Sequence, residues 1–303
     1  MSRNAIVKKS KKLIGTSRSI VKRRVTPSDN FFGGAVVPFV EGSPVTDLIS
    51  GPVYQQYRGG EYVHVSDLLY SCMRKVALSD KLKTPIHSRP IYDSQGITFA
   101  QGEAIHSYIV GKAVRQDPSI VYGNWTCNCG KHVITGTKVK ADREGTCGAC
   151  NSPIHRYREI VVTNETYKVS GSIDLVLVPN GAIYPVELKS IKKDSWEELA
   201  RPVPEHLSQV LMYWFLLREA GYNVHDKASI VYAVKEMVMK NPFKEFVIRP
   251  SELMDRIQVY LDLARELVLY REIGQLPNRI GGCYAPDSKD AKACQFCTIC
   301  FQL

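Results

Sequence analysis

Three charged side chains occupy two neighbouring apolar segments of this sequence. Asp174 ends the segment Gly171-Ser-Ile-Asp, and Glu187 and Lys189 belong to the later segment Val-Glu-Leu-Lys. Residues two apart on a strand project from the same face, so Glu187 and Lys189 should lie side by side. A charge inside an apolar strand is costly unless it is paired or bound to a metal. Two carboxylates suit Mg²⁺ or Mn²⁺, and a nearby ammonium can orient a water molecule or stabilise charge on a phosphate.

Two other segments carry polar residues at helical spacing. Gly102 and His106 are four apart and share one helix face, where the glycine would allow close packing and the histidine would act as a third metal ligand. His206, Gln209 and Tyr213 share one face of a second helix, where they would contact a strand, a phosphate or the catalytic groups. Each motif alone also fits a plainer interpretation, such as a core histidine or a buried ion pair.

The nine cysteines form two groups and one isolated position. The first group, with the spacing C-x-C-x17-C-x2-C, comprises Cys127, Cys129, Cys147 and Cys150. The second group comprises Cys283, Cys294, Cys297 and Cys300, and Cys72 stands alone. Close cysteine pairs suit metal binding, and the lack of a secretion signal favours a reducing compartment over one that forms disulfides.

The first cysteine group predicts a structural zinc ribbon. Gly130 and Gly148 would form the tight knuckle turns that point backbone amides at the sulfur atoms. Four thiolates close the zinc tetrahedron and leave no open position for water, so we expect a staple without chemistry of its own.

The charge of the chain is concentrated at its beginning. The sequence has 40 Lys+Arg against 30 Asp+Glu, a net charge of +10. Residues 1–24 hold nine of the basic side chains and no acidic one, which leaves residues 25–303 near +1. Such a basic arm fits either polyanion binding or a solvated terminus, and a transit peptide is a minor third option. No apolar run reaches the roughly 18 residues of a membrane span.

Periodicity and turn residues predict the elements that position these motifs. We expect helices over 64–82, 98–115, 204–220 and 251–273, the second opened by a capping box at Thr98. Strands are expected over 157–169 and 171–178, joined at Ser170-Gly171, and over 183–189, 229–234 and 245–248.

In this order, the motifs GxxxH, GxxD, ExK and QxxxY resemble the PD-(D/E)XK nuclease superfamily, in particular its RecB-like exonuclease branch. Ile173 stands where the proline of the superfamily name would be. The resemblance implies an α/β fold with a restriction-endonuclease-like core, whose central mixed sheet is flanked by helices. The domain would span 61–303, with a zinc-ribbon insertion at 125–156, after an arm and irregular lead-in at 1–60.

The resemblance also implies roles for single residues. Asp174, Glu187, the Leu188 carbonyl and His106 would bind Mg²⁺ or Mn²⁺, and Lys189 would position the attacking water. The residues expected to hold or contact DNA are Gln209, Tyr213, Arg74, Lys75 and His206. The implied activity is a metal-dependent DNA nuclease, an exonuclease before a structure-specific endonuclease. A non-catalytic DNA-binding or assembly protein, or more weakly a zinc-ribbon transcription factor, is the rival interpretation.

Iron–sulfur members of this branch, including CRISPR-associated and AddB-type exonucleases, join one upstream cysteine to three at the C-terminus. That pattern implies a [4Fe–4S] cluster that clamps both ends of the domain, with the C-terminal segment at 283–303. The five-residue gap between Cys294 and Cys300 favours the ligands Cys72, Cys283, Cys294 and Cys300, with Cys297 as the alternative ligand. A second zinc is the alternative cofactor.

The expected partners are DNA and a protein such as a helicase or another replication, recombination or viral component, with no membrane. We expect a cytoplasmic location, in a prokaryote or a phage-infected host.

Overall fold

The computed structural model describes residues 57, 60–70, 72–86, 91–236 and 240–303, all within one compact unit of residues 50–303. The basic arm and most of the predicted lead-in lie outside the described residues. No helix of the described part is long and apolar enough to cross a membrane.

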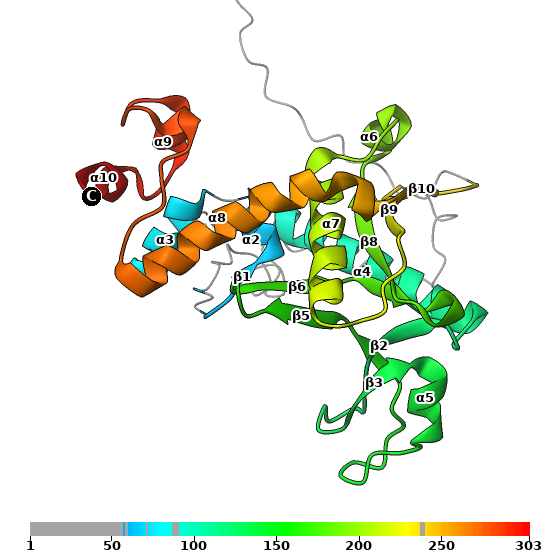
Figure 1. Cartoon of the computed structure of the whole chain (residues 1–303). Helices are drawn as coiled ribbons and strands as arrows, with labels where there is room; N and C mark the ends of the chain where they lie inside the picture. Colours follow the sequence, from blue (N-terminus) through cyan, green and yellow to red (C-terminus); the bar gives the residue numbers. More distant parts are fainter. Residues whose placement is uncertain (1–56, 58–59, 71, 87–90, 237–239) are drawn as a thin grey trace, which may run out of the picture. The chain divides into compact units, whose positions relative to one another are not determined.

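A mixed sheet forms the centre of the unit (Figure 1). Its strands, in spatial order, are β10 (Phe243–Ile248), β9 (Ala228–Val234), β8 (Tyr184–Ile191), β7 (Leu175–Leu177), β2 (Val121–Thr126) and β3 (Val133–Thr137). β8 and β9 are parallel, and the other neighbours are antiparallel. A seventh strand, β4 (Arg156–Arg158), pairs with the outer half of β2. A smaller sheet has the order β1 (Val63–His64), β6 (Val169–Ile173), β5 (Ile160–Asn164).

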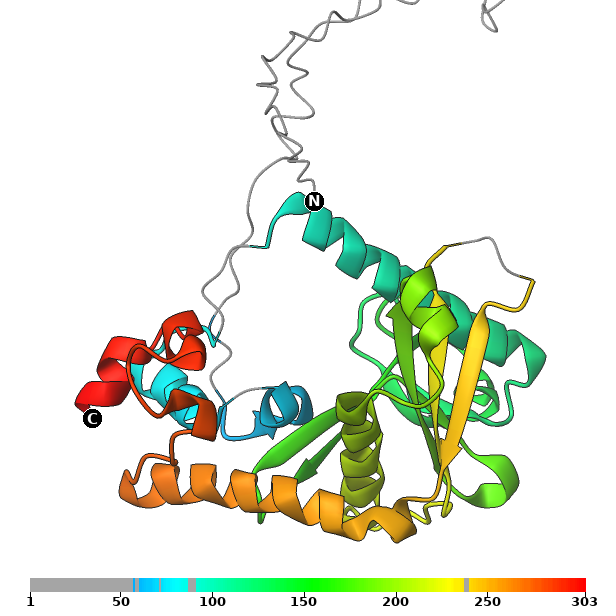
Figure 2. The ribbon, with the colours of Figure 1, turned by 90° about the horizontal axis from the view of Figure 1, so that it is seen from above.

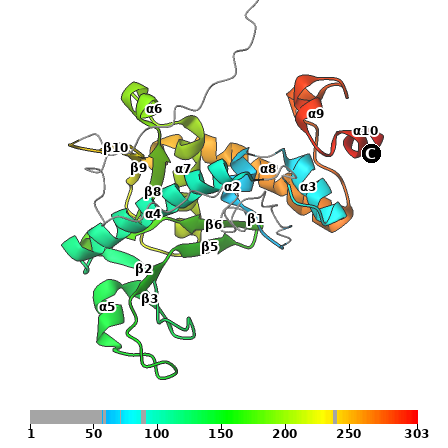
Figure 3. The same ribbon diagram turned by 180° about the vertical axis from the view of Figure 1, so that it is seen from behind.

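Helices cover both faces of the main sheet. α7 (Pro204–Glu219) and α4 (Asp93–Gln116) lie on opposite faces (Figures 1 and 3), and both contact β8. The long helix α8 (Met254–Ile273) crosses α7 and packs along α2 (Val65–Tyr70) and α3 (Met73–Leu82), as Figure 2 shows. The shorter helices are α5 (Lys138–Arg143), α6 (Lys193–Glu198), α9 (Lys289–Ala293) and α10 (Cys297–Gln302). The predicted central mixed sheet with its helices is therefore confirmed.

Three element boundaries differ from the sequence prediction. The helix expected over 64–82 is two helices, because Cys72 has extended backbone angles at the start of α3. α4 begins at Asp93, ahead of Thr98, and its capping box pairs Tyr92 with Gln95. The turn expected at Ser170-Gly171 lies earlier in the chain, between β5 and β6.

That earlier turn is closed by side-chain and backbone chemistry within it. The Asn164 side chain accepts a hydrogen bond from the Tyr167 amide at 3.0 Å, and Lys168 adopts the left-handed φ of 50°. Asn favours such turns because its short amide can bond the local backbone. Gly171 is consequently an interior residue of β6, paired with Val162.

Candidate active site

Gly171 sits in β6 because α7 packs directly against it. A Cβ atom built at Gly171 would lie 2.8 Å from two ring carbons of Tyr213, closer than real contacts allow. The Tyr213 hydroxyl accepts a hydrogen bond from Gln209 Nε2 at 2.8 Å, and both side chains are buried. The glycine of one motif and the tyrosine of another therefore form a single packing contact, which fixes α7 against the small sheet.

Asp174 occupies the bend where the chain leaves β6 and enters β7. Its Oδ2 atom accepts a hydrogen bond from the backbone amide of Leu188 on β8, at 2.8 Å. Glu187 and Lys189 flank that amide, and Lys189 Nζ lies 2.5 Å from Glu187 Oε1. Pairing of β7 with β8 thus brings the GxxD and ExK motifs to one point, as the sequence predicted.

Glu187 is a buried acid with an unsatisfied oxygen. Only 1% of the residue is exposed, and its Oε2 atom has no hydrogen-bond partner among the described residues. Burial, with the charge of Asp174 second, raises the pKa of Glu187 to about 8. Burial also raises the pKa of Asp174, against the opposing effect of His106. Two desolvated carboxylates repel one another, and a cation between them would relieve that cost.

α4 delivers the histidine of the GxxxH motif. Gly102 lies against β8, because a Cβ atom there would be 3.1 Å from Ser190 Oγ. One turn later, His106 Nδ1 lies 3.8 Å from Asp174 Oδ1. The donor set of two carboxylates and an imidazole fits a divalent metal. Their ligand atoms do not all come within 4.8 Å of one another.

Two side chains near the site were missed by the sequence analysis. Tyr70, at the end of α2, is 51% exposed, and its hydroxyl is close enough to Lys189 and Glu187 for their charges to act on its pKa, which burial raises. Glu159, between β4 and β5, accepts a hydrogen bond from the Ser172 hydroxyl, and its charge contributes to the raised pKa of Asp174. Neither residue belongs to a spaced motif, so only tertiary contacts could reveal them.

Two of the predicted DNA contacts have other surroundings. Arg74 is buried, and its guanidinium donates to the Pro277 carbonyl at 3.0 Å and to Cys300 Sγ at 3.3 Å. These contacts give Arg74 a structural position, whereas we expected it to contact DNA. His206 Nδ1 lies 2.9 Å from the Tyr232 hydroxyl, and burial followed by the charge of Lys189 lowers its pKa to about 4. His206 is therefore neutral at neutral pH. Lys75 lines the C-terminal cysteine cavity.

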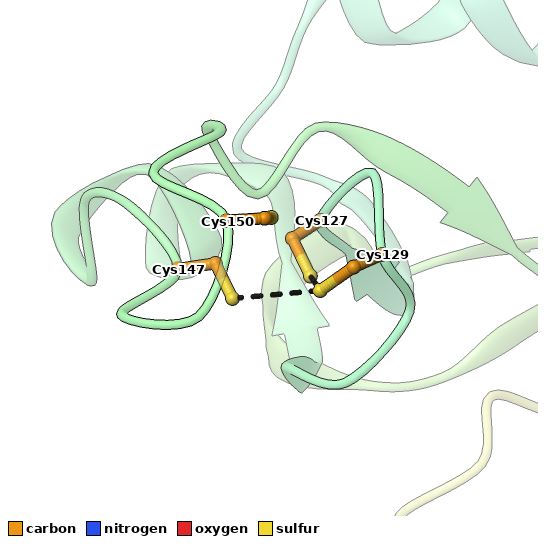
Figure 4. Close-up of side chains that lie close together, drawn as sticks. All are labelled: Cys127, Cys129, Cys147 and Cys150. Atoms are coloured by element: carbon orange, nitrogen blue, oxygen red, sulfur yellow. Dashed lines mark hydrogen bonds between the residues drawn. The ribbon is translucent and has the colours of Figure 1, made fainter.

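The four cysteines of the insertion form a site that could bind a metal ion. Their sulfur atoms all lie within 4.8 Å of one another (Figure 4). The first knuckle turns at Gly130, with φ of 71°, as expected, whereas Asn151 and not Gly148 takes the left-handed position of the second, with φ of 52°. The Ala149 amide lies 3.4 Å from Cys147 Sγ, which is the amide-to-sulfur contact typical of a zinc knuckle.

The second cysteine group surrounds a separate cavity of about 230 Å³. Its lining includes all five of the remaining cysteines: Cys72, Cys283, Cys294, Cys297 and Cys300. The pKa of Cys283 is raised, chiefly by burial. Smaller contributions come, in decreasing order, from the charges of Cys72, Asp290, Cys294 and Cys300. The Cys297 thiol instead donates to the Pro286 carbonyl at 3.5 Å. Among these five described cysteines, no three have sulfur atoms that all lie within 4.8 Å of one another, unlike those of the insertion.

Comparisons with known proteins give loose structural likenesses. No protein-family model matches the sequence, and no curated protein gives a significant match. Similar solved structures include LHK-Exo, an alkaline exonuclease from Laribacter hongkongensis, at 10% identity and a TM-score of 0.39, covering 72% of this chain and 95% of that one. The structure of LHK-Exo in complex with dAMP gives 12% identity and a TM-score of 0.38, covering 72% of this chain and 95% of that one. SSO0001 gives 14% identity and a TM-score of 0.34, covering 71% of this chain and 79% of that one.

Proposed function

We propose that this protein is a metal-dependent DNA nuclease, and specifically an exonuclease of the RecB-like branch of the PD-(D/E)XK superfamily. The observation that carries the proposal is the unpartnered, buried Oε2 atom of Glu187. It lies in a site that also holds Asp174, Lys189 and, through Asp174, His106. Folding around an orphaned carboxylate oxygen is costly, and a site that binds a cation recovers that cost.

The ligands of the divalent metal would be His106, Asp174, Glu187 and the Leu188 carbonyl. When bound, Mg²⁺ or Mn²⁺ would polarise the scissile phosphate and acidify an attacking water. The hydrogen bond from the Leu188 amide holds Asp174 in place for this role. Gln209 and Tyr213 are hydrogen-bonded to each other and buried against Gly171, so their part in holding the strand would be to fix α7 beside the metal site.

Lys189 would act as a fixed positive charge in this mechanism. Burial is the largest single influence and opposes its ionisation, but the charge of Glu187, the hydrogen bond to Glu187 and the charges of Asp174 and Tyr70 together leave the pKa of Lys189 raised. A lysine with a raised pKa stays protonated at neutral pH, so it donates hydrogen bonds and does not accept the proton of the attacking water. Its ammonium would orient that water or support charge that develops on the phosphate.

Two substitutions test the nuclease proposal. Lys189→Ala and Asp174→Ala should each reduce Mg²⁺-dependent cleavage of DNA by at least about 100-fold, with unchanged circular dichroism. The matched control is Lys192→Ala, because Lys192 lies next to the same strand but outside the site. Full activity of both site variants on single-stranded and duplex DNA would reject the assignment. Linear DNA cut faster than closed circles would support an exonuclease over a structure-specific endonuclease.

We further propose a [4Fe–4S] cluster held by Cys72, Cys283, Cys294 and Cys300. The cavity that all five cysteines line supports this proposal, and the Cys297–Pro286 hydrogen bond supports leaving Cys297 out of the set. Protein prepared without oxygen should contain iron and absorb near 400 nm, together with one zinc in the insertion. Two equivalents of zinc and no iron would reject the cluster.

A further inference from the structure

A groove of about 1070 Å³ borders the candidate site. Its lining includes Asp174 and His106 of that site together with Val133 and His155 of the insertion. Residues of α4 form part of its lining, and the β2–β4 pair, with Trp125 and Tyr157, forms another part. The groove thus joins two features that no sequence motif connects, the candidate catalytic site and the zinc-ribbon insertion.

Three arginines line this groove without a counter-charge of their own. Arg115 on α4 and Arg156 and Arg158 on β4 are all exposed. None of the three side chains makes an ion pair or hydrogen bond with another described residue. Arg156 and Arg158 are two apart on one strand, so they project to the same side. Apart from Asp174, the groove contains one acid, Glu159, whose carboxylate accepts from the Ser172 hydroxyl.

The position of these arginines relative to the site is set by the sheet. β2 pairs with β7 at Val121 and Tyr122 and then with β4 from Asn124 to Thr126, so one strand carries both neighbours. β7 in turn pairs with β8, which holds Glu187 and Lys189. Continuous hydrogen-bonded strands therefore connect the arginines to the catalytic carboxylates, and the side chains are presented from a rigid surface.

We propose that this groove binds the phosphate backbone of a DNA strand between the catalytic site and the insertion, and that the insertion forms a wall of the substrate path. The inference rests on the proposed nuclease function and extends it to the strand beyond the scissile bond. Guanidinium groups suit phosphates because their planar donors match phosphate oxygens in pairs. Unpaired arginines in a groove that ends at a metal-binding site provide that recognition where the strand must pass.

Binding measured without cleavage tests the inference. The background variant is Lys189→Ala in Mg²⁺-free buffer, and the readout is the fluorescence anisotropy of labelled single-stranded DNA over a range of salt. Adding Arg156→Gln and Arg158→Gln should weaken binding about 10-fold and reduce the slope of log K against log salt by about 1.4, since each phosphate contact on a single strand contributes about 0.7. Arg256→Gln, an exposed arginine on α8, is the matched control and should change neither quantity.

The zinc content separates DNA binding from a structural role of Arg158. Arg158 lies beside the first knuckle, because a Cβ atom on Gly130 would be 3.5 Å from its Nη2 atom. If Arg158→Gln loses zinc, Arg115→Gln with Arg156→Gln replaces the double variant and should give the same two changes. A zinc-loaded variant whose affinity and salt slope equal those of the background would overturn the inference.

A photocrosslink locates the strand directly. Val133 lines the groove and is 49% exposed, and Val259 on α8 is 58% exposed and far from it in sequence and fold. With p-benzoylphenylalanine at each position, DNA should crosslink at residue 133 and not at 259. Equal crosslinking at both would overturn the inference. If the wild-type protein cleaves DNA but these tests fail, only the groove proposal is rejected. If the wild-type protein cleaves no DNA with Mg²⁺, the proposed nuclease function is rejected.

Discussion

At the residue scale, Glu187 connects the energetics of the fold with the proposed chemistry. Its pKa rises from an ordinary 4.5 to about 8 because burial and Asp174 both disfavour its ionised form. A raised pKa means that the folded protein binds this proton more tightly than the unfolded chain does. The associated stability is therefore complete below about pH 4.5 and is lost as the pH rises through 8.

The Mg²⁺-free protein should accordingly become less stable between pH 6.5 and 8. In this window His206, whose pKa is lowered from 6.5 to about 4, is neutral in the folded protein but still partly protonated in the unfolded chain near pH 6.5, so it offsets a small part of the decline, whereas Asp174 shifts in the same direction as Glu187. We expect the free energy of unfolding in urea to fall by about 1–2 kcal/mol across the window, and Glu187→Gln to flatten the decline. Identical pH profiles of the two proteins would contradict the buried carboxyl. Added Mg²⁺ should stabilise the wild type most at pH 8, because the metal competes with the proton.

The contact between Gly171 and Tyr213 makes a second residue-scale prediction. Gly171→Ala would place a methyl group 2.8 Å from the tyrosine ring, on a strand and a helix that are both packed. We expect a loss of about 1–3 kcal/mol in the free energy of unfolding, measured by chemical denaturation. Gly96→Ala on α4 is the control, because no atom lies within 4 Å of its Cβ position. That change should be neutral or stabilising, since alanine favours helix, and an equal loss in both variants would rule out the steric explanation.

Most of the candidate site could be predicted from sequence because its residues belong to elements of regular period. Glu187 and Lys189 follow from strand alternation, and Gln209 and Tyr213 follow from helical spacing. Glu159 could not be predicted, because it reaches Ser172 through the pairing of β5 with β6 and carries no periodic signal of its own. Spacing also cannot distinguish an exposed arginine from one that is buried against a cysteine, as Arg74 is.

At the element scale, the insertion is joined to the sheet by a shared core. Trp125, Cys127 and Cys147 belong to the same buried cluster as Val110 of α4 and Leu188 of β8. Leu188 lies between Glu187 and Lys189, so the cysteine knuckles and the strand of the candidate site share packing. The sequence predicted a staple without chemistry of its own over 125–156 and did not predict this shared core, because cysteine spacing carries no information on what the ribbon packs against.

Loss of zinc should therefore reach the catalytic sheet. Cys147→Ser should lower the zinc content and reduce Tm by on the order of 10 °C, since a structural zinc contributes several kcal/mol to folding. Hydrogen exchange should quicken in β2 and α4 but not in the middle of α8, which packs in a different cluster. Cys297→Ser is the control and should keep both zinc and iron. If exchange quickens within 125–156 alone, the shared core does not transmit the loss.

The turn between β5 and β6 illustrates what element-scale prediction lacks. Ser170-Gly171 has the composition of a turn, yet Gly171 is needed inside β6 to admit Tyr213. The glycine at this position therefore does meet a special requirement, which is close packing against Tyr213 and not a turn. Sequence alone predicts a turn because Tyr213 lies on a helix more than forty residues later.

At the scale of the whole molecule, two distant segments are joined near the C-terminus. α10 packs on α3, Arg74 holds Cys300, and Gln295 Nε2 donates to the Pro85 carbonyl at 2.5 Å. Figure 2 shows α9 and α10 beside α3. The cysteine cavity thus lies between segments more than two hundred residues apart in sequence, as a clamp requires.

The distribution of charge over the whole chain assigns separate tasks to the arm and the groove. Residues 25–303 carry almost no net charge, whereas residues 1–24 carry nine basic side chains and no acid. A near-neutral body has little long-range attraction for DNA, so the groove arginines would act after contact, and the arm would supply the initial attraction.

Deletion of residues 1–24 should weaken association with DNA more than it slows cleavage. We expect the salt slope of binding to fall by up to about 6, the limit for nine contacts to a single strand at about 0.7 each. The cleavage rate at saturating DNA should stay within about twofold, because no residue of the candidate site is removed. Arg156→Gln with Arg158→Gln should instead lower the rate at saturating DNA as well, since the strand beside the metal would lose its position. Unchanged salt-dependent binding after the deletion would show that the arm does not contact DNA and leave attraction to the groove alone.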